Sequence, residues 1–346
     1  MRCCVIGGGI AGVLLSWRLA EHAEVELWTG PADPVDATRV SGGAVRGWEP
    51  DPAQRWLAID SLCELYADDR LREWSRYTET GFLVAVEDLL TLEDAATQID
   101  RSVPGSAQLL PARALARDGW AGLPWAGGAL FERRAGFIDP HALRRAVLGD
   151  LRRRATVTIR HATAPVHASS TGADLTVVAA GAWTPSVLAA MGVRAARRTS
   201  GGLRTKLVEY AVHPAGEWRP LPFIDTLTGL YGRPTPEGLL LGLPTDEWDV
   251  PPGARPSGAS DRPARLAADR FPRLVLGRSV RRVALPDCYA DDGLLRLRPV
   301  DGSLFTFTGG SGGAAKTALA ATRIATDELV GPLVPTAPPI PAFARI

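Results

Sequence analysis

The chain has 346 residues, 46% of them hydrophobic, and a formal net charge of +1. This length allows a sizeable core and predicts about two domains, while the balanced charge gives no reason to expect a nucleic-acid partner. No apolar run is long enough to span a membrane as a helix, so a membrane partner is not expected either.

The first thirty residues are typical of a β-α-β unit that binds a dinucleotide. An apolar strand over residues 3–6 leads into a G-x-G-x-x-G turn and a helix, and a second strand follows over residues 25–28. The first glycine permits the turn, the second lets a diphosphate approach the backbone, and the third lets the helix pack on the strand. The helix N-terminus also favours the diphosphate. The predicted contacts are Gly7, Gly9, Ile10, Ala11 and Gly12.

The end of the second strand departs from the usual pattern. Thr29 stands where an acidic residue normally binds the adenosine ribose, and it offers a hydroxyl without a charge. Asp33 and Asp36 lie further along the loop and are alternative ribose contacts. No arginine stands at this strand end to receive a 2′-phosphate, so NADP is not favoured.

Cysteine and histidine usage gives no sign of a metal site. The four cysteines have no C-x-x-C spacing, and the five histidines have no ligand spacing, so solvated or helix-edge roles are expected for the histidines. Arg2 before an apolar run resembles the start of a signal peptide, but Gly7, Gly8 and Gly9 interrupt that run. We therefore expect a cytoplasmic chain in a reducing compartment.

A loop with several small residues is expected over residues 29–47. Its paired glycines predict either a close approach of the backbone to a ligand or an ordinary turn. The loop residues of interest are Thr38, Arg39, Ser41, Gly42 and Gly43.

Helices and strands alternate through the middle of the chain. Asp51 as N-cap and Pro52 as the first helical residue predict one helix, and Asp139 with Pro140 predicts another. Strands are expected over residues 81–86, 128–131 and 156–159, and short helical segments over residues 71–77 and 92–99. Residues 103–127 are rich in Pro, Gly and Ala and are expected to be mostly loop.

The second half of the chain is richer in strands. A buried strand over residues 174–181 ends in a glycine turn before another helix. An antiparallel sheet is expected from strands over residues 206–212, 229–232 and 239–243, followed by a helix over 263–270 and strands near residues 280 and 294. A last strand over 303–308 meets a second glycine turn over 309–313, a helix over 315–330 and a proline-rich tail. This order predicts an α/β fold, with one dinucleotide domain built from separated segments and an inserted sheet.

Five motifs follow one another in a set order. They lie at residues 5–12, 136–140, 174–183, 231–242 and 309–316. In this order they resemble the D-amino-acid oxidase, glycine oxidase and sarcosine oxidase family of FAD-dependent oxidoreductases, and the resemblance covers nearly the whole chain. It implies a Rossmann-like FAD-binding domain of the GR2 type and a substrate domain built on an inserted antiparallel sheet.

The resemblance also implies domain boundaries and FAD contacts. Residues 1–80, 128–195 and 285–346 would form the FAD-binding domain, and residues 81–127 and 196–284 the substrate domain. FAD would lie extended, with the first glycine turn at its diphosphate. Its further expected contacts are Thr29, Thr38, Arg39, Ser41, Gly42, Gly43, Ala180, Gly181, Trp183, Gly310, Ser311, Gly312, Gly313, Ala314 and Lys316.

In the family that the chain resembles, a C–H group next to an amine nitrogen gives a hydride to flavin N5, and the resulting imine hydrolyses. The implied substrate is a small amine or amino acid. A substrate carboxylate would favour arginine, whose planar fork binds it in bidentate fashion. The candidates for catalysis and substrate binding are Arg46, Tyr231, Arg233 and Lys316, with Arg204 and Arg298 as further arginines; ordinary packing or ion pairing is the alternative for each.

Two positions depart from the sarcosine oxidase branch of the family. Leu240 replaces a lysine that assists the reaction with oxygen, which removes that reason to expect fast turnover with O₂. Cys288 precedes Tyr289 in the region where that branch bonds a cysteine to the flavin, but the downstream spacing is shorter. A free, partly buried thiol is expected at Cys288 rather than a covalent bond.

Other functions stay open. A FAD-dependent dehydrogenase, or a specialised biosynthetic tailoring oxidase with poor O₂ reactivity, would suit Leu240 and Thr29. A non-catalytic dinucleotide-binding protein is permitted by the missing ribose carboxylate, although the intact glycines argue against it. Residues 310–317 nearly form a phosphate-binding Walker loop, but Ala315 replaces a required glycine. The sequence determines neither the substrate's identity nor the oligomeric state.

Overall fold

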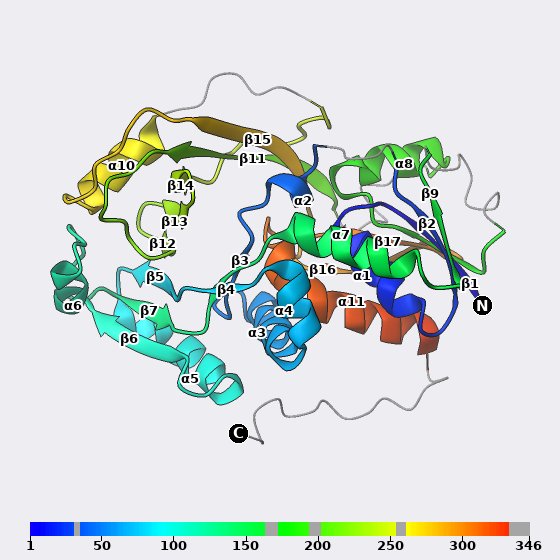
Figure 1. Cartoon of the computed structure of the whole chain (residues 1–346), viewed down its shortest axis with the longest axis horizontal. Helices are drawn as coiled ribbons and strands as arrows, with labels where there is room; N and C mark the ends of the chain where they lie inside the picture. Colours follow the sequence, from blue (N-terminus) through cyan, green and yellow to red (C-terminus); the bar gives the residue numbers. More distant parts are fainter. Residues whose placement is uncertain (31–34, 163–171, 194–201, 254–260, 332–346) are drawn as a thin grey trace.

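The computed structural model describes residues 1–30, 35–162, 172–193, 202–253 and 261–331. Its named strands form three sheets. Figure 1 shows the strands of the first sheet on the right and those of the second sheet on the left. The tail predicted over residues 332–346 lies outside the described residues, as do Asp33 and His167.

The first sheet brings together strands from distant parts of the chain. Its neighbours pair in parallel, except that the two strands nearest the C-terminus pair antiparallel. In spatial order its six strands are β16 (Leu295–Asp301), β17 (Leu304–Gly309), β10 (Leu175–Val178), β1 (Arg2–Ile6), β2 (Glu24–Trp28) and β9 (Val157–Arg160). The sheet is thus built from separated segments of the chain, with β1 between β10 and β2 as dinucleotide-binding sheets place their first strand between two neighbours.

Helices cover both faces of the first sheet. Those on one face are α1 (Ile10–Leu19), α7 (Pro140–Leu151) and α11 (Ala314–Val330). There Val5 of β1 packs in one core with Leu14 of α1. On the other face, Leu188 of α8 (Thr184–Ala190) packs with Cys4 of β1. Because both faces are buried, the central strands are apolar along most of their length.

Two helices begin at the residues that the sequence predicted. In α3 (Pro52–Ala67) the Asp51 carboxylate accepts the N–H of Gln54 at 2.8 Å. In α7 the Asp139 carboxylate accepts the N–H of Ala142 at 2.9 Å. Each carboxylate satisfies an N–H group that the first turn of a helix leaves without a partner, and the proline after it needs no such partner.

The second sheet is antiparallel except where β12 pairs with β5. In spatial order its eight strands are β15 (Arg281–Tyr289), β11 (Arg204–His213), β14 (Gly238–Gly242), β13 (Tyr231–Thr235), β12 (Phe223–Asp225), β5 (Phe82–Val86), β7 (Gly128–Glu132) and β6 (Ala107–Pro111). The predicted antiparallel sheet is therefore present. The domain boundaries stay a prediction. Strand β7 and the part of β15 from residue 285 onward, both assigned to the FAD-binding domain, pair within this sheet.

Three two-residue strands form a small third sheet. Its strands are β3 (Ala44–Val45), β8 (Gly136–Phe137) and β4 (Thr78–Glu79), with α4 (Asp69–Ser75) just before β4. The remaining short helices of the described residues are α2 (Ala37–Val40), η1 (Leu89–Leu92), α5 (Glu93–Ser102), α6 (Ala112–Arg117), η3 (Gly181–Trp183) and α10 (Arg262–Arg270).

The short strands β6 and β12 and the short helix α6 were not predicted. The segment expected to be mostly loop over residues 103–127 is so for more than half of its length, but it also contains β6 and α6 (Ala112–Arg117). The backbone of β6 pairs along its whole length with β7, and this long-range contact outweighs the weak local preference of its residues. Strand β12 was missed because three residues carry too little periodicity to recognise.

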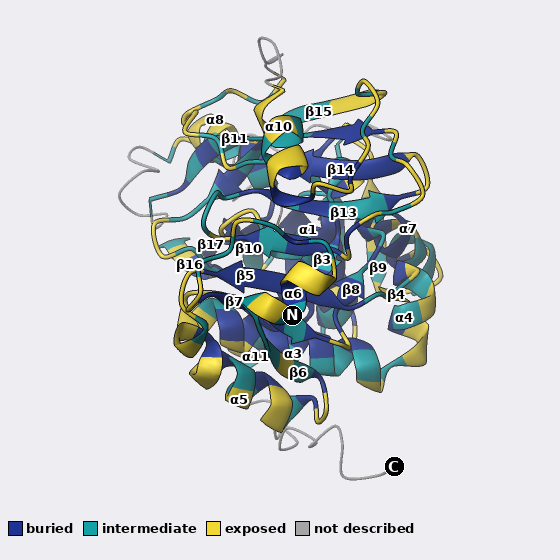
Figure 2. Ribbon diagram, turned by 90° about the vertical axis from the view of Figure 1, so that its left-hand side faces the viewer, coloured by how far each residue is buried: buried dark blue, intermediate teal, exposed yellow. Residues whose placement is uncertain are grey.

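Alternation along β5 places its side chains in two different cores. Leu83 packs with Phe223 and Phe271 on one side, under α10. Val84 packs with Ile99 of α5 on the other side. Figure 2 shows β5 and β14 as buried strands, with the exposed surfaces of α5 and α6 outside them. The sheet is thus covered on both faces at this point, which explains its continuous apolar sequence.

We expect Phe223→Ala to destabilise the protein by about 3–5 kcal/mol, because truncation leaves a cavity that the core cannot refill. Phe223 is fully buried, with its ring centroid 5.6 Å from that of Trp120 and 4.9 Å from that of Phe271. Urea unfolding would measure the loss. Leu221→Ala is the control, because Leu221 is 43% exposed. Equal losses in the two variants would contradict this description of the core.

Candidate functional site

A cavity of about 410 Å³ lies at the carboxyl ends of β1, β2 and β10, and residues of β15 and β17 also line it. In an open parallel sheet this edge is the usual place for a ligand. The residues predicted from the sequence that line this cavity are Gly7, Gly9, Ile10, Ala11, Thr29, Thr38, Ser41, Ala180, Gly181, Trp183, Gly312 and Ala314.

The first glycine turn is held by backbone contacts that exclude side chains. A Cβ atom on Gly7, whose φ is +140°, would lie 2.1 Å from the carbonyl oxygen of Ala179 on the neighbouring strand end. A Cβ on Gly12 would lie 2.1 Å from the carbonyl oxygen of Gly7. At Gly9 the same test finds only the Thr38 hydroxyl, at 3.4 Å. Gly7 and Gly12 therefore allow close packing of the backbone segments. Gly9 has no side chain that would project into the cavity, so a ligand can approach its backbone.

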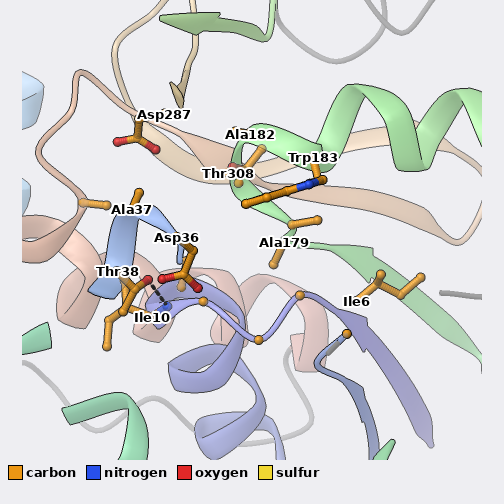
Figure 3. Close-up of a pocket in the computed structure, with 18 of the residues that line it drawn as sticks. Ile6, Ile10, Asp36, Ala37, Thr38, Ala179, Ala182, Trp183, Asp287 and Thr308 are labelled. Atoms are coloured by element: carbon orange, nitrogen blue, oxygen red, sulfur yellow. Dashed lines mark hydrogen bonds between the residues drawn. The ribbon is translucent and has the colours of Figure 1, made fainter. Parts of the chain in front are cut away.

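The N-terminus of α1 opens into the cavity. Its N-cap, Gly9, has no side chain to accept a first-turn N–H. The N–H of Ile10 donates instead to the hydroxyl of Thr38, at 3.0 Å, as Figure 3 shows. The N–H groups of Ala11 and Gly12 have no carbonyl within the helix to bond. This end of α1 can therefore accept an anionic group such as a diphosphate.

Trp28, Thr29 and Trp183 also line the cavity. The Thr29 hydroxyl lies 2.8 Å from Nδ1 of His161, so it already has a polar partner. Asp36, the alternative ribose contact, also lines the cavity. Its carboxylate is 2.6 Å from the guanidinium of Arg144, and the side chains of both are largely buried. Asp36 therefore has a structural partner, and its charge is balanced within the protein.

The loop residues expected near the ligand separate into two groups. Thr38 and Ser41 reach the cavity, whereas Arg39 is exposed on α2 (Ala37–Val40). Gly43 has φ +66°, and a Cβ there would lie 2.0 Å from the carbonyl oxygen of Ile138. Gly43 thus allows β3 to approach the 136–140 segment, and neither it nor Gly42 lines the cavity. Of the two interpretations of this glycine pair, the geometry of Gly43 supports a backbone turn.

The second glycine turn faces two ways. Gly309, Gly312 and Ala314 line the large cavity. A separate hollow of about 10 Å³ lies on the other side of the turn, and it is lined in part by Gly310, Ser311, Gly313 and Lys316. The Ser311 hydroxyl is 2.7 Å from the side-chain oxygen of Gln54.

Arg46 and Lys316, two of the predicted catalytic residues, meet at one carboxylate. Oε1 of Glu49 lies 2.8 Å from Arg46 and 3.0 Å from Lys316, and all three side chains are buried. Burial alone would raise the pKa of Glu49, but the positive charges of Lys316 and Arg46 hold it below its usual value. Burial lowers the pKa of Lys316 against the opposing charge of Glu49. Neither cation is among the residues lining the large cavity.

The other two predicted catalytic residues lie on one face of the second sheet. Strand register places Tyr231 in line with Gly242 and Tyr210, and Arg233 in line with Leu240. The hydroxyl of Tyr210 donates to the carbonyl oxygen of Val40 at 2.6 Å, so this face looks towards α2. The opposite face packs in the core beneath α10.

Tyr231 and Arg233 differ in how far their polar groups are satisfied. The Tyr231 hydroxyl donates to the carbonyl oxygen of Glu209 at 2.9 Å, and burial raises its pKa. Arg233 stacks on Phe137 at 4.4 Å and donates to the carbonyl oxygen of Pro234. Its buried Nε has no hydrogen-bond partner among the described residues. Arg233 therefore has an N–H group that could donate to a ligand. The Tyr231 hydroxyl already has its hydrogen-bond acceptor within the protein.

Asp287 on β15 is a cavity residue that the sequence did not indicate. Burial raises the pKa of its carboxyl to about 6, and the charge of Asp36 acts in the same direction. Of the described residues that line the cavity, only Asp36 and Asp287 carry a charge. In Figure 3, Asp287 lies well away from Ile6, the last residue of β1. No local pattern marks an aspartate inside a strand, so only the sheet pairing reveals this position.

Cys288, the next residue along the chain, is 2% exposed and does not line the cavity. Burial raises the pKa of its thiol to about 12. A thiolate is the reactive form of cysteine, and this environment disfavours it. The expected free, buried thiol agrees with this geometry. Of the other arginines considered, Arg204 pairs with Asp249 at 2.9 Å and Arg298 with Asp292 at 2.6 Å.

Within the described residues, no group of three or more His, Cys, Asp or Glu side chains is arranged to hold a metal ion. One histidine expectation was wrong, because His213 is 6% exposed and its Nδ1 lies 3.0 Å from the carbonyl oxygen of Gly277. Of the helices in the described part of the chain, none has the length and apolar character needed to cross a membrane.

A family model described as DAO, FAD dependent oxidoreductase, matches residues 2–328 of the chain. No curated protein matches the chain by sequence. Among solved structures, glycine oxidase from Geobacillus kaustophilus is similar with a TM-score of 0.70 at 19% identity, over 95% of this chain and 94% of that one. L-proline dehydrogenase from P. horikoshii has a TM-score of 0.75 at 17% identity, over 94% and 92%.

A third similar structure is NikD, described as an unusual amino acid oxidase essential for nikkomycin biosynthesis. It has a TM-score of 0.67 at 18% identity, over 95% of this chain and 93% of that one. At these identities the structural similarity establishes the shared fold.

Alanine at Gly12 and alanine at Gly9 should have different effects. We expect Gly12→Ala to lose both thermal stability and ligand binding, because its methyl group would overlap the carbonyl oxygen of Gly7. Gly9→Ala should keep the fold and weaken FAD binding by about tenfold or more, since its methyl group would occupy the space through which a diphosphate approaches the backbone. Thermal melting and FAD fluorescence titration measure the two effects. Similar melting temperatures for both variants would contradict the packing role of Gly12.

Asp287→Asn should stabilise the protein at pH 8 and have little effect at pH 4. The folded state raises this pKa from 3.8 to about 6, so folding favours the protonated carboxyl and stability falls as the pH rises through that window. Asparagine removes a penalty of at most about 3 kcal/mol at pH 8. Urea unfolding of wild type and variant at the two pH values tests this. An equal difference at both would show that ionisation of Asp287 is not the cause.

Proposed function

Because the chain belongs to the DAO family of FAD-dependent oxidoreductases, we propose that it oxidises a C–N bond of a small amine or amino acid to an imine. The single observation that carries this proposal is the cavity at the carboxyl edge of the first sheet, where two glycine turns meet. A dinucleotide whose diphosphate lies at the first turn would extend along this cavity towards the second turn.

The residues of the cavity fit FAD. A diphosphate can approach the N-terminus of α1, because Gly9 has no side chain there and the first N–H groups of the helix face the cavity. Trp183 lines the cavity while 41% exposed, and its ring offers a stacking surface for an adenine at the rim. The Thr29 hydroxyl is hydrogen-bonded to His161, so it offers only a weak contact for the ribose in place of the usual carboxylate. We therefore assign the predicted residues that line the cavity to FAD binding.

The substrate is proposed to lie between the second sheet and the cavity, on the face that carries Tyr210, Arg233 and Leu240. Buried Leu240 keeps water from this face, and the free donor of Arg233 can orient a polar group of the substrate. When bound, FAD supplies the two-electron acceptor for the hydride that leaves the carbon next to nitrogen. The amine nitrogen loses a proton, so the product is an imine.

A second candidate function, a dehydrogenase with poor O₂ reactivity, is favoured by Leu240. The side chain at this position is apolar and 4% exposed, so Leu240 itself brings no positive charge, and the guanidinium of Arg233, in line with it on the same face, is stacked on Phe137. A nearby cation would favour the reduction of oxygen by stabilising the negative charge that forms. A non-catalytic binding protein is less well supported, since Gly7, Gly9 and Gly12 keep their separate roles.

The purified protein should be yellow, and acid precipitation should leave the yellow colour in the supernatant. The reason is that Cys288 lies outside the cavity wall with its thiol pKa raised to about 12. An absorption spectrum before and after precipitation measures this. A yellow pellet in the wild type that becomes colourless in Cys288→Ala would show a covalent bond instead. A protein that stays colourless with added FAD would contradict the proposed function.

A substrate amine should bleach the flavin absorbance in the absence of oxygen. After bleaching, we expect the colour to return slowly with O₂ and at least about tenfold faster with an artificial electron acceptor, because Leu240 brings no cation to the site. Stopped-flow absorbance measures both rates. Fast recovery with O₂ alone would favour an oxidase over a dehydrogenase.

A further inference from the structure

Asp287 brings a carboxyl group from the second sheet to the cavity. It lies near the end of β15, is half-buried, and lines the cavity together with Thr308 and Gly309 of β17. The end of β15 also contacts the second glycine turn, because the N–H of Ala290 donates to the carbonyl oxygen of Gly310 at 3.3 Å. A ligand that fills the cavity as far as the second turn therefore meets Asp287.

The position of Asp287 identifies the half of FAD that it would contact. With the diphosphate at the N-terminus of α1, the adenosine half lies towards the end of β2, where Thr29 lines the cavity. That end is next to Ile6, which pairs with Trp28, and in Figure 3 Ile6 lies well away from Asp287. The half of FAD that carries the flavin ring would extend the other way, towards the second turn and β15.

Strand register separates Asp287 from the proposed substrate position. Arg233 lies opposite Leu240, and Leu240 lies opposite Val212 of β11. Val212 in turn lies opposite Arg281, six residues before Asp287 on β15. Six residues of a β-strand span about 20 Å. One small amine at Arg233 would therefore not reach Asp287, and the expected ligand of this carboxyl is the cofactor.

The carboxyl of Asp287 has no counter-ion among the described residues. Its Oδ1 accepts the N–H of Cys288 at 2.8 Å, and neither a second donor nor a cation of the described part of the chain pairs with it. Asp36, the N-cap of α2, is the charge nearest in effect, and its own oxygens accept from Arg144 at 2.6 Å and from the N–H of Arg39 at 2.9 Å. One oxygen of Asp287 is thus left to meet a ligand.

The other elements packed against β15 do not neutralise Asp287. Lys206 of β11 is in register with it, but the ammonium of Lys206 lies over the rings of Trp248 and Tyr289, at 4.8 and 5.7 Å from their centroids. Arg204, on the same face of β11, is already paired with a carboxylate. Neither η3 nor β17 contains a titratable side chain.

An uncharged carboxyl suits this position. Burial raises the pKa of Asp287 to about 6, and the charge of Asp36 acts in the same direction. FAD in the cavity would displace the water that solvates a carboxylate there, and its diphosphate would add negative charge. Both effects raise this pKa further, so the complex favours the protonated carboxyl.

We propose that Asp287 contacts the ring-bearing half of FAD as an uncharged carboxyl group that donates a hydrogen bond, so that FAD binding takes up a proton from water. The proton adds to the carboxylate oxygen that has no partner in the protein, and Oδ1 keeps its bond to the N–H of Cys288. This inference rests on the proposed binding of FAD in the cavity, and it does not depend on which amine is oxidised.

The test is a fluorescence titration of the FAD-free chain with FAD at pH 5 and pH 8. Because this pKa is higher in the complex than in the free protein, the affinity should be full below about pH 6 and fall above it, by at least about tenfold at pH 8. In Asp287→Asn the amide oxygen accepts the N–H of Cys288 and the amide N–H donates to FAD. Its affinity should change less than about threefold between the two pH values and exceed that of the wild type at pH 8 by at least about tenfold.

Two further variants separate charge from hydrogen bonding. Glu209→Gln is the matched control, because burial also raises the pKa of Glu209 on the neighbouring strand, but Glu209 does not line the cavity. It should keep the pH dependence of the wild type. Asp287→Leu removes the charge and the donor together, so its affinity should not depend on pH and should be at least about threefold weaker than that of Asp287→Asn. Equal affinities of these two variants would contradict the donor role.

An indicator dye provides a measurement that needs no variant. In weakly buffered solution at pH 7, the wild type should take up close to one proton for each FAD bound, because its free carboxyl is mostly ionised there. Asp287→Asn should take up clearly less. Uptake near zero by the wild type would overturn the inference.

The inference and the proposed function fail in different ways. A wild type that binds no FAD at either pH would overturn the assignment of FAD to the cavity. Tight binding with equal affinity at both pH values would overturn the inference alone, and weaker binding by Asp287→Asn would then identify Asp287 as a charged acceptor. A pH dependence that persists unchanged in Asp287→Asn would also overturn it, and would point to His161, which is hydrogen-bonded to Thr29 of the cavity wall.

Discussion

The structure depends on the close contact of three backbone segments at the first glycine turn. Gly7 and Gly12 let the end of β1, the start of α1 and Ala179 after β10 approach within distances that no Cβ atom would permit. This contact leaves the first N–H groups of α1 facing the cavity. The same contact lies where β1 and β10 pair in the parallel sheet, and residues of β15 line the cavity beside it.

Charge is distributed unevenly around this contact. The cavity wall carries only carboxyl groups among its described charged residues, and Asp36 has Arg144 as its partner. The buried cations of the region, Arg46 and Lys316, lie outside the wall and pair with Glu49. We therefore expect the cavity to bind anionic groups through backbone N–H groups rather than through side-chain cations, because these two cations are paired with a carboxylate of the protein.

Local signals predicted the elements well where a few neighbouring residues decide the structure. Asp51 and Asp139 marked the starts of α3 and α7 because N-capping needs only three residues of context. Strand β6 was missed because its pairing with β7 is a long-range contact. Most of the predicted FAD contacts reach the cavity, since a glycine turn specifies its own shape. Asp287 could not be found in this way, because its neighbours in space come from other strands and helices.

The sequence by itself determined the dinucleotide turn and the alternation of helices with two kinds of sheet, which follow from spacing and periodicity, properties of neighbouring residues. The family came from the resemblance of five ordered motifs, and the family model confirms it. Only the tertiary structure decided which charged side chains face the cavity and which ones neutralise each other. Glu49 and Lys316 are far apart in the chain, and their contact depends on α11 packing against the segment after β3. Electrostatic energy depends on distance and burial, and the chain order specifies neither for such a pair.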